Sequence, residues 1–143
     1  MAHIPFTRRE LANAWRNLYK LSKQSTGRTN PHRLLLFYAV ECGLKAAWLK
    51  HQARDILTSA DVHKFGHKLD VIAQALCFPP LGLKNFSLSD VSISQQKEPR
   101  ANYAMDHLHQ AWRYGAVLLS PVDDQTMEAV LDRLHSLIEK ELR

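Results

Sequence analysis

One long segment of the chain is apolar on almost every side, and this limits the folds that the chain can adopt. Its apolar residues are Leu34, Leu35, Phe37, Tyr38, Val40, Cys42, Leu44, Ala47, Trp48 and Leu49. Asn30 and Pro31 precede them and are typical of a helix start, because proline in the first turn loses no intrahelical hydrogen bond. A helix that is apolar around most of its circumference must be covered by other elements. The sequence therefore predicts a central helix over residues 31–53 in a helical bundle.

Amphipathic segments before and after this helix in the sequence are predicted to pack against it. Thr7 and Glu10 have the spacing of a capping box and predict a first helix that runs to about Lys23. Further helices are predicted over 67–76, over 99–115 with Gly115 as a left-handed end, and from Ser120 and Pro121 onward. The predicted fold is an all-α, single-domain bundle of about five helices that spans residues 1–143.

The segment over residues 81–98 has the least regular pattern. Its part FSLSDVSIS alternates partly like a short strand. Because no second strand is evident beside it, we interpret the whole segment as a long loop with a functional role.

Composition places the chain among ordinary globular proteins, with an uneven distribution of charge. The net charge is +5 over 143 residues, and residues 1–68 carry 12 Lys and Arg against 4 Asp and Glu. A basic half of this kind attracts nucleic acid or an acidic protein. No run of apolar residues is long enough for a membrane helix, so we expect no membrane contact and a cytoplasmic location. Cys42 and Cys77 lack metal or disulfide spacing and are expected to be reduced thiols.

The segment PRANYAMDHLHQAWRYG, residues 99–115, holds the candidate catalytic residues. Arg100 and His107 are seven residues apart, so on a helix they share a face about 10 Å apart along the axis. Asn102 and Tyr103 lie between them. Arginine binds phosphate, and histidine transfers protons near neutral pH. This set fits RNA cleavage without a metal, with Arg100 and His107 as catalytic residues; the alternative is a helix that only packs and docks.

The order of these segments resembles the HEPN family of small helical bundles, over roughly residues 31–115. The resemblance rests first on Ala39, Glu41, Lys45 and Ala46, which match the pattern A-x-E-x-x-x-K-A in FYAVECGLKAAWLKH. It rests further on the segment FGHKLDVIAQAL, where His67, Leu69 and Ile72 match the pattern His-x-Leu-x-x-Ile or Leu, and on the ending WRYG. These short patterns imply the HEPN helical fold and, by themselves, no activity.

Many HEPN proteins are RNases, often toxins or antiviral effectors, with an arginine followed after four to six residues by a histidine. Arg100 and His107 fit this spacing, although Ala101 stands where active members usually carry Asn, Asp or His. The resemblance implies a metal-independent endoribonuclease of a toxin or antiviral defence system, with Asn102, Tyr103 and Arg113 in substrate binding and RNA as substrate. It also implies a homodimer, or a protein partner such as a nucleotidyltransferase-type antitoxin.

The ending WRYG leaves an alternative, because it resembles HEPN proteins that lack the nuclease motif. In that case Arg113 and Tyr114 are structural, and the chain is a non-catalytic interaction subunit that binds a protein or nucleic acid. The sequence gives no reason to expect a cofactor.

Two further pairs were weighed as sites. His63 and His67 have the i, i+4 spacing of a zinc pair, but Gly66 interrupts the helix and no third ligand is nearby, so we expect no metal and a helix-start contact for His67. Glu41 and Lys45 are expected to form an ion pair at the surface of the bundle.

Overall fold

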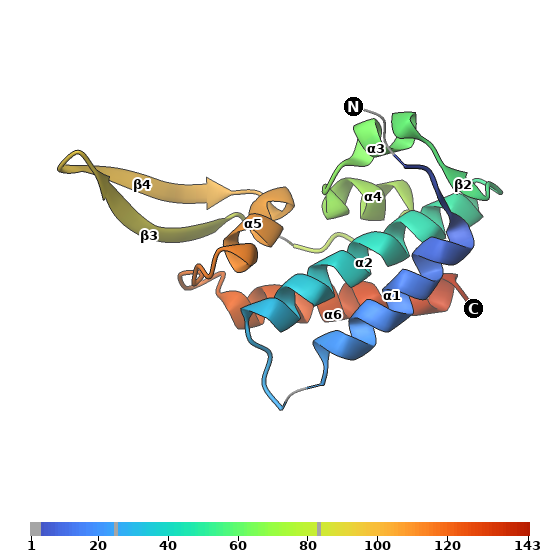
Figure 1. Cartoon of the computed structure of the whole chain (residues 1–143), viewed down its shortest axis with the longest axis horizontal. Coiled ribbons are helices and arrows are strands. Elements are labelled where there is room, and N and C mark those ends of the chain that lie inside the picture. The colour runs from blue at the N-terminus through green and yellow to red at the C-terminus, as the bar shows by residue number, and fades with distance from the viewer. Residues whose placement is uncertain (1–3, 25, 83) are drawn as a thin grey trace.

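The structure is a computed structural model that describes residues 4–24, 26–82 and 84–143. In these ranges the chain forms six α-helices, one 3-10 helix and two antiparallel sheets of two strands each, so the fold is mainly α (Figure 1). The helices are α1 (Arg8–Ser22), α2 (Asn30–His51), α3 (Ser59–Phe65), α4 (Leu69–Ala75), η1 (Met105–His107), α5 (Leu108–Arg113) and α6 (Asp124–Glu141). The strands are β1 (Phe6–Thr7), β2 (Ile56–Leu57), β3 (Phe86–Ile93) and β4 (Gln96–Tyr103).

Helix α2 is the centre of the molecule, as its apolar pattern predicts. Helices α1, α4, α5 and α6 all pack against it. Figure 1 shows α3 and α4 above α2, with α1 and α6 below it. The buried side chains of α2 are almost all apolar and join a single core. Burial of this face against four helices is the main source of stability of the fold.

Gly43 sets how closely the helices approach one another. A Cβ atom built on Gly43 would lie 2.6 Å from Cδ1 of Trp15 on α1 and 2.9 Å from Cγ2 of Ile138 on α6. Because protein cores have almost no free volume, only glycine fits where α1 and α6 meet on α2.

Two of the predicted helix starts can be compared with the structure directly. The capping box at Thr7 is confirmed, since the Glu10 amide donates to Oγ1 of Thr7 and the Thr7 amide donates to Oε1 of Glu10. For α2, the N-cap is Thr29 rather than Asn30, which belongs to the helix itself. Thr29 is extended, as a capping residue should be, and Pro31 still lies in the first turn.

The prediction of a loop over 81–98 and a helix over 99–115 is wrong. Strands β3 and β4 form an antiparallel hairpin, with Phe86 opposite Tyr103 and Ile93 opposite Gln96. Helix α5 begins only at Leu108, and Gly115, with φ 77°, follows its end as predicted. The fold is therefore not all-α, although the bundle around α2 is as expected.

The hairpin turn explains why the sequence pattern was misleading. Ser94 and Gln95 both have positive φ, 51° and 64°, in the two-residue turn. Such turns usually carry Asn-Gly or Asp-Gly, and neither is present. Pro99 disfavours a strand interior, but here it follows Glu98, opposite an irregularity in β3 between Leu88 and Val91. The strand β4 therefore lacks the usual signals of a strand.

No helix in the described ranges is both long and apolar enough to cross a membrane.

Candidate functional site

Six polar or charged residues meet along one side of α2, and we call them the histidine cluster. Helix α2 contributes Tyr38, Glu41 and Lys45, whose spacing of three and four residues places them on one face. The other members are His67, which precedes α4, and His109 and Arg113 on α5. Because α4 and α5 both pack against α2, residues far apart in sequence come together here.

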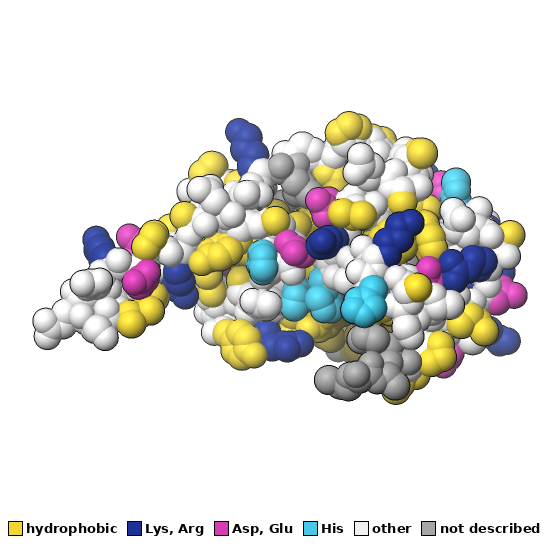
Figure 2. Space-filling view, turned by 90° about the horizontal axis from the view of Figure 1, so that it is seen from above, with side chains coloured by type: hydrophobic (Ala, Val, Ile, Leu, Met, Phe, Trp, Pro, Cys, Tyr) yellow, Lys and Arg dark blue, Asp and Glu magenta, His cyan; other side chains and the backbone are white. Residues whose placement is uncertain are grey.

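Figure 2, seen from above Figure 1, shows this side of the molecule. Histidine side chains gather in the middle of the face, with acidic and basic side chains beside them. Most other side chains of α2 between Leu36 and Leu49 are buried in the core. The histidine cluster is thus the polar edge of this apolar part of the helix.

The contact between Glu41 and His67 is the basis of the cluster. Oε1 of Glu41 contacts Nδ1 of His67, and Oε2 lies 3.6 Å from Nζ of Lys45. The hydrogen bond and charge of Glu41 raise the pKa of His67, against burial and the charges of Lys45 and Arg113. A carboxylate on Nδ1 directs the proton of that nitrogen and leaves Nε2 for exchange with a bound molecule.

The surroundings of His109 shift its pKa in the opposite direction from that of His67. Its ring centroid lies 4.3 Å from that of His67, and the residue is only 7% exposed. Burial lowers the pKa of His109 first, and the charges of His67 and Arg113 lower it further. Two adjacent histidines with pKa values shifted in opposite directions can hold one proton between them near neutral pH, which is the requirement for an acid and a base.

Nδ1 of His109 is buried and makes no hydrogen bond within the described part of the chain. Buried polar atoms are nearly always satisfied in folded proteins, so an exception needs an explanation. The backbone of Asp106, three residues earlier, is the polar group that acts on the ring, and Nδ1 itself is buried too deeply for a bound molecule to reach.

Lys45 and Arg113 make the cluster positively charged. Lys45 is 8% exposed, and its ion pair with Glu41 is therefore buried instead of lying at the surface as expected. The exposed guanidinium of Arg113 donates to the hydroxyl of Tyr38 and also interacts with that of Tyr114, and its remaining donors can bind an anion. With His67 protonated, three cations stand against one carboxylate, so the cluster favours an anionic ligand.

Arg100 and His107, the predicted catalytic residues, do not share a helix. Arg100 lies on β4, where Nε donates to the carbonyl of Ser89 at 2.7 Å, and His107 ends η1. Both still line one pocket of about 260 Å³, together with Tyr103 and Tyr114.

The rings of Tyr103 and His107 are 6.0 Å apart in this pocket, and Oδ1 of Asp106 lies 3.9 Å from Nε2 of His107. The pocket brings the two residues together through the hairpin instead of helical periodicity.

The predicted substrate-binding residues, Asn102, Tyr103 and Arg113, do not lie together: two are on the hairpin and one is on α5. Asn102 is exposed near the end of β4, with φ 61°, and its backbone amide donates to Oγ of Ser87. Tyr103 packs on Phe86 in the pocket with Arg100. Arg113 belongs to the histidine cluster.

Sequence reasoning missed His109, which was not among the predicted site residues. His67 was assigned only a helix-start contact. A charged pair, Glu41 and Lys45, inside the most apolar helix is the signal that could have indicated the site. Within the residues that the structure describes, no group of three or more His, Cys, Asp or Glu could hold a metal ion.

Comparisons with protein-family models, with curated proteins and with solved structures found no match to this chain.

Proposed function

We propose that this chain is a HEPN-like, metal-independent endoribonuclease of a toxin or antiviral defence system, and that His67 and His109 are its acid and base. The observation that carries the proposal is the adjacent histidine pair with oppositely shifted pKa values, beside two cations. The resemblance of residues 31–115 to the HEPN family, many members of which are RNases, supports it.

The chemistry requires one proton to leave the nucleophile and another to reach the leaving group. The 2′ oxygen of a ribose attacks the adjacent phosphorus while His109, neutral, accepts the proton of that hydroxyl. The bond from phosphorus to the 5′ oxygen breaks, and His67, protonated, gives its proton to that oxygen. The products are a 2′,3′-cyclic phosphate and a 5′ hydroxyl.

Charge on the phosphoryl oxygens must also be stabilised. Arg113 is exposed and can donate two parallel hydrogen bonds to a phosphate. Lys45 is buried beside Glu41 and raises the local positive potential without direct contact. Glu41 acts as a positioning residue, because it holds Nδ1 of His67 and leaves Nε2 toward the substrate.

The deciding experiment is RNA cleavage in EDTA by wild-type protein and by His67→Gln and His109→Gln, with analysis of product ends. His51→Gln is the matched control, since His51 is an exposed histidine at the end of α2. Loss of a general acid or base typically slows a reaction by about 10² to 10⁴ fold. We expect losses of this size in both cluster variants and wild-type cleavage in the control.

The same assay includes Arg100→Gln and His107→Gln. If only these two variants lose cleavage, the protein is an RNase at the originally predicted pair and the assignment to the histidine cluster is wrong. Absence of cleavage by the wild type across several RNAs overturns the enzymatic proposal.

The alternative proposal is a non-catalytic interaction subunit, and the hairpin favours it. Figure 1 shows β3 and β4 projecting from the helices, and Ile93 near its tip is 59% exposed. In the described ranges each of these strands pairs only with the other as a strand, and apart from the Ser87 carbonyl, which accepts from the Leu119 amide at 3.0 Å, their outer edges carry no backbone partner from another segment. Open edges and exposed apolar side chains are typical of surfaces that bind another chain. Binding without cleavage would support this alternative.

A further inference from the structure

A row of positively charged side chains follows the outer side of α1, and we call it the basic stripe. Its members are Arg9, Arg16, Lys20 and Lys23, at successive intervals of seven, four and three residues. These intervals place all four on one side of a helix. Arg9 and Lys23 are fourteen residues apart, which corresponds to about 21 Å along the helix axis.

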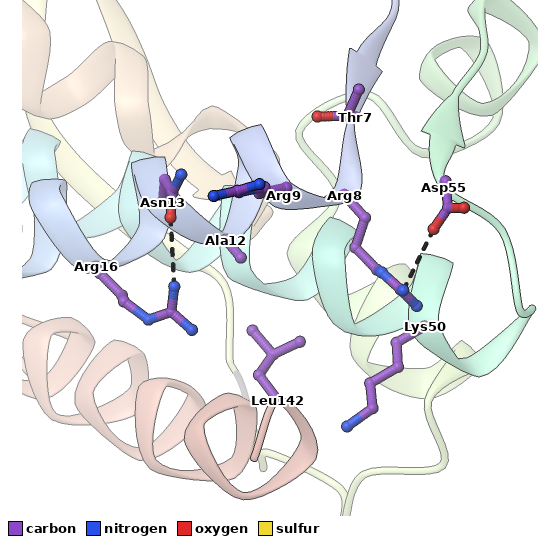
Figure 3. Close-up of a pocket in the computed structure, with 9 residues that line it drawn as sticks. All are labelled: Thr7, Arg8, Arg9, Ala12, Asn13, Arg16, Lys50, Asp55 and Leu142. Atoms are coloured by element: carbon purple, nitrogen blue, oxygen red, sulfur yellow. Dashed lines mark hydrogen bonds and ion pairs between the residues drawn. The ribbon is translucent and has the colours of Figure 1, made fainter.

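The stripe borders an open groove between α1 and the ends of α2 and α6 (Figure 3). The groove has a volume of about 710 Å³. Its charged lining residues are Arg8, Arg9, Arg16, Lys50 and Asp55. Four cations against one carboxylate give this groove a strong positive potential.

The cations of the groove differ in how many hydrogen bonds and ion pairs they already make within the protein. Arg8 pairs with Asp55 at 3.2 Å, and Nζ of Lys50 donates to the carbonyl of Glu141 at 2.7 Å. Arg16 makes only a 3.4 Å contact with Asn13 and lies over the ring of Trp15. The side chain of Arg9 makes no hydrogen bond or ion pair with the described residues. Arg9 and Arg16 are therefore the donors that a ligand can use.

A second open groove continues the first along α1. It has a volume of about 550 Å³ and shares Arg16 and Leu142 with the first groove. Lys20 adds positive charge there, while Arg143 pairs with Glu139 at 3.2 Å. Together the two grooves form a continuous basic track along the contact between α1 and α6.

We infer that this track binds the phosphate backbone of RNA; the choice of RNA over DNA rests on the proposed function. A row of cations at helical spacing matches a polymer that repeats one negative charge along its length. Arginine donors fit phosphate oxygens in pairs. An interface with an acidic protein usually has an apolar centre. The only aliphatic lining residues of the first groove are Ala12 and Leu142, and the apolar lining of the second is mainly the rings of Trp15 and Tyr19, a type of side chain on which RNA bases stack.

The track and the histidine cluster lie on different sides of α2. Helix α1 is below α2 in Figure 1, whereas α4, next to His67, is above it. The track would therefore hold a part of the RNA that is not cleaved. It should add affinity and salt dependence without taking part in the reaction.

The test measures binding of a fluorescently labelled single-stranded RNA by anisotropy over a series of salt concentrations. The protein carries His67→Gln so that the RNA stays intact. The test variant adds Arg9→Gln and Arg16→Gln. The control variant instead adds Arg133→Gln and Lys140→Gln, which are also seven residues apart and exposed, but on α6 and outside both grooves.

Loss of two phosphate contacts should lower the slope of log K against log salt by about 1.4 and weaken binding by about tenfold at moderate salt. The control should keep the wild-type slope. Equal loss in both variants would show attraction by net charge alone and overturn the inference. Polyglutamate that competes as well as unlabelled RNA of equal charge would assign the track to an acidic protein and overturn it also.

The results separate this inference from the proposed function. If binding depends on Arg9 and Arg16 but the wild type does not cleave RNA, the inference about the track holds and the enzymatic proposal is wrong. If the wild type cleaves RNA and binding is unchanged by Arg9→Gln and Arg16→Gln, the inference about the track is wrong and the proposed function stands.

Discussion

Oε1 of Glu41 contacts Nδ1 of His67, although the two residues lie 26 positions apart and on different elements. This contact joins the central helix to the start of α4 and fixes one ring nitrogen of the histidine.

Replacing Glu41 by Gln should lower the pKa of His67. The carboxylate is the main cause of the raised pKa, while Lys45 and Arg113 act against it. NMR titration of the His67 ring protons would measure the change, with His51 as an internal reference. An unchanged midpoint in Glu41→Gln would contradict the contact.

The same pair makes stability depend on pH. A histidine whose folded pKa is raised adds stability below its unfolded pKa of about 6.5, and this stability is lost as pH rises through the folded pKa. Urea unfolding of wild type and Glu41→Gln over this window should show a smaller loss in the variant. Parallel curves would mean that His67 titrates alike in the folded and unfolded states.

His135 should give a pH dependence of the opposite sign. Its Nδ1 accepts a hydrogen bond from Nε1 of Trp15 at 3.0 Å, and its ring stacks on Tyr19. Burial lowers the pKa of His135, so its contribution to stability is present above about pH 6.5 and is lost as pH falls through the folded pKa. Protonation of Nδ1 also removes the acceptor of the Trp15 indole.

Trp15 fluorescence reports this titration directly. A change in emission should follow the His135 midpoint below pH 6.5 and should disappear in His135→Gln. His32→Gln serves as a control, because His32 lies at the start of α2 and contacts Thr29 instead. Persistence of the change in His135→Gln would assign it to another group.

Gly43→Ala should destabilise the protein despite the better helix propensity of alanine. Propensity favours alanine by about 1 kcal/mol, but forcing a methyl group against Trp15 and Ile138 typically costs about 1 to 3 kcal/mol. We expect a net loss in urea unfolding. Gly27→Ala is the matched change in open space and should have little effect. A more stable Gly43→Ala would show that the helices can move apart freely.

A better turn should stabilise the hairpin alone. Ser94 and Gln95 have positive φ, which Asn and Gly adopt at lower cost. Replacing Ser94 by Asn together with Gln95 by Gly should slow amide exchange in β3 and β4. Exchange in α2 should stay as it is. Faster exchange in the strands would show that the turn has a different geometry in solution.

The sequence was sufficient to predict elements whose signals are local. Helix α1 has a capping box, α6 has an apolar stripe, and α2 is apolar on most sides. Each of these patterns acts within one helix, where periodicity is informative. The bundle around α2 was predictable for this reason.

The hairpin was not predictable from the same signals. Its turn lacks glycine, and β4 carries Pro99 with mostly polar neighbours. The strand exists because β3 pairs with it and because Phe86 and Tyr103 pack together at the base of the hairpin. Such pairing depends on tertiary context more than on propensity. Arg100 was placed on the wrong element for this reason.

Part of the histidine cluster was predictable from the sequence, and part of it depends on tertiary contacts. Glu41 and Lys45 could be assigned to one helix face, and Arg113 was named as a binding residue. His67 and His109 meet only because α4 and α5 dock on the same side of α2. The spacing of residues in the sequence does not predict that two short helices pack against the same side of α2.

The position of α6 also bears on the order in which the chain can fold during synthesis. Trp15 finds the acceptor for its indole N–H on His135, 120 residues later, and the packing around Gly43 is completed by Ile138. While α1 and α2 have left the ribosome and residues 124–141 have not, the apolar seam between these two helices stays open to water. A nascent chain with such a seam is a substrate for chaperones that bind exposed apolar segments. Closure of the bundle therefore waits for the last helix to be made.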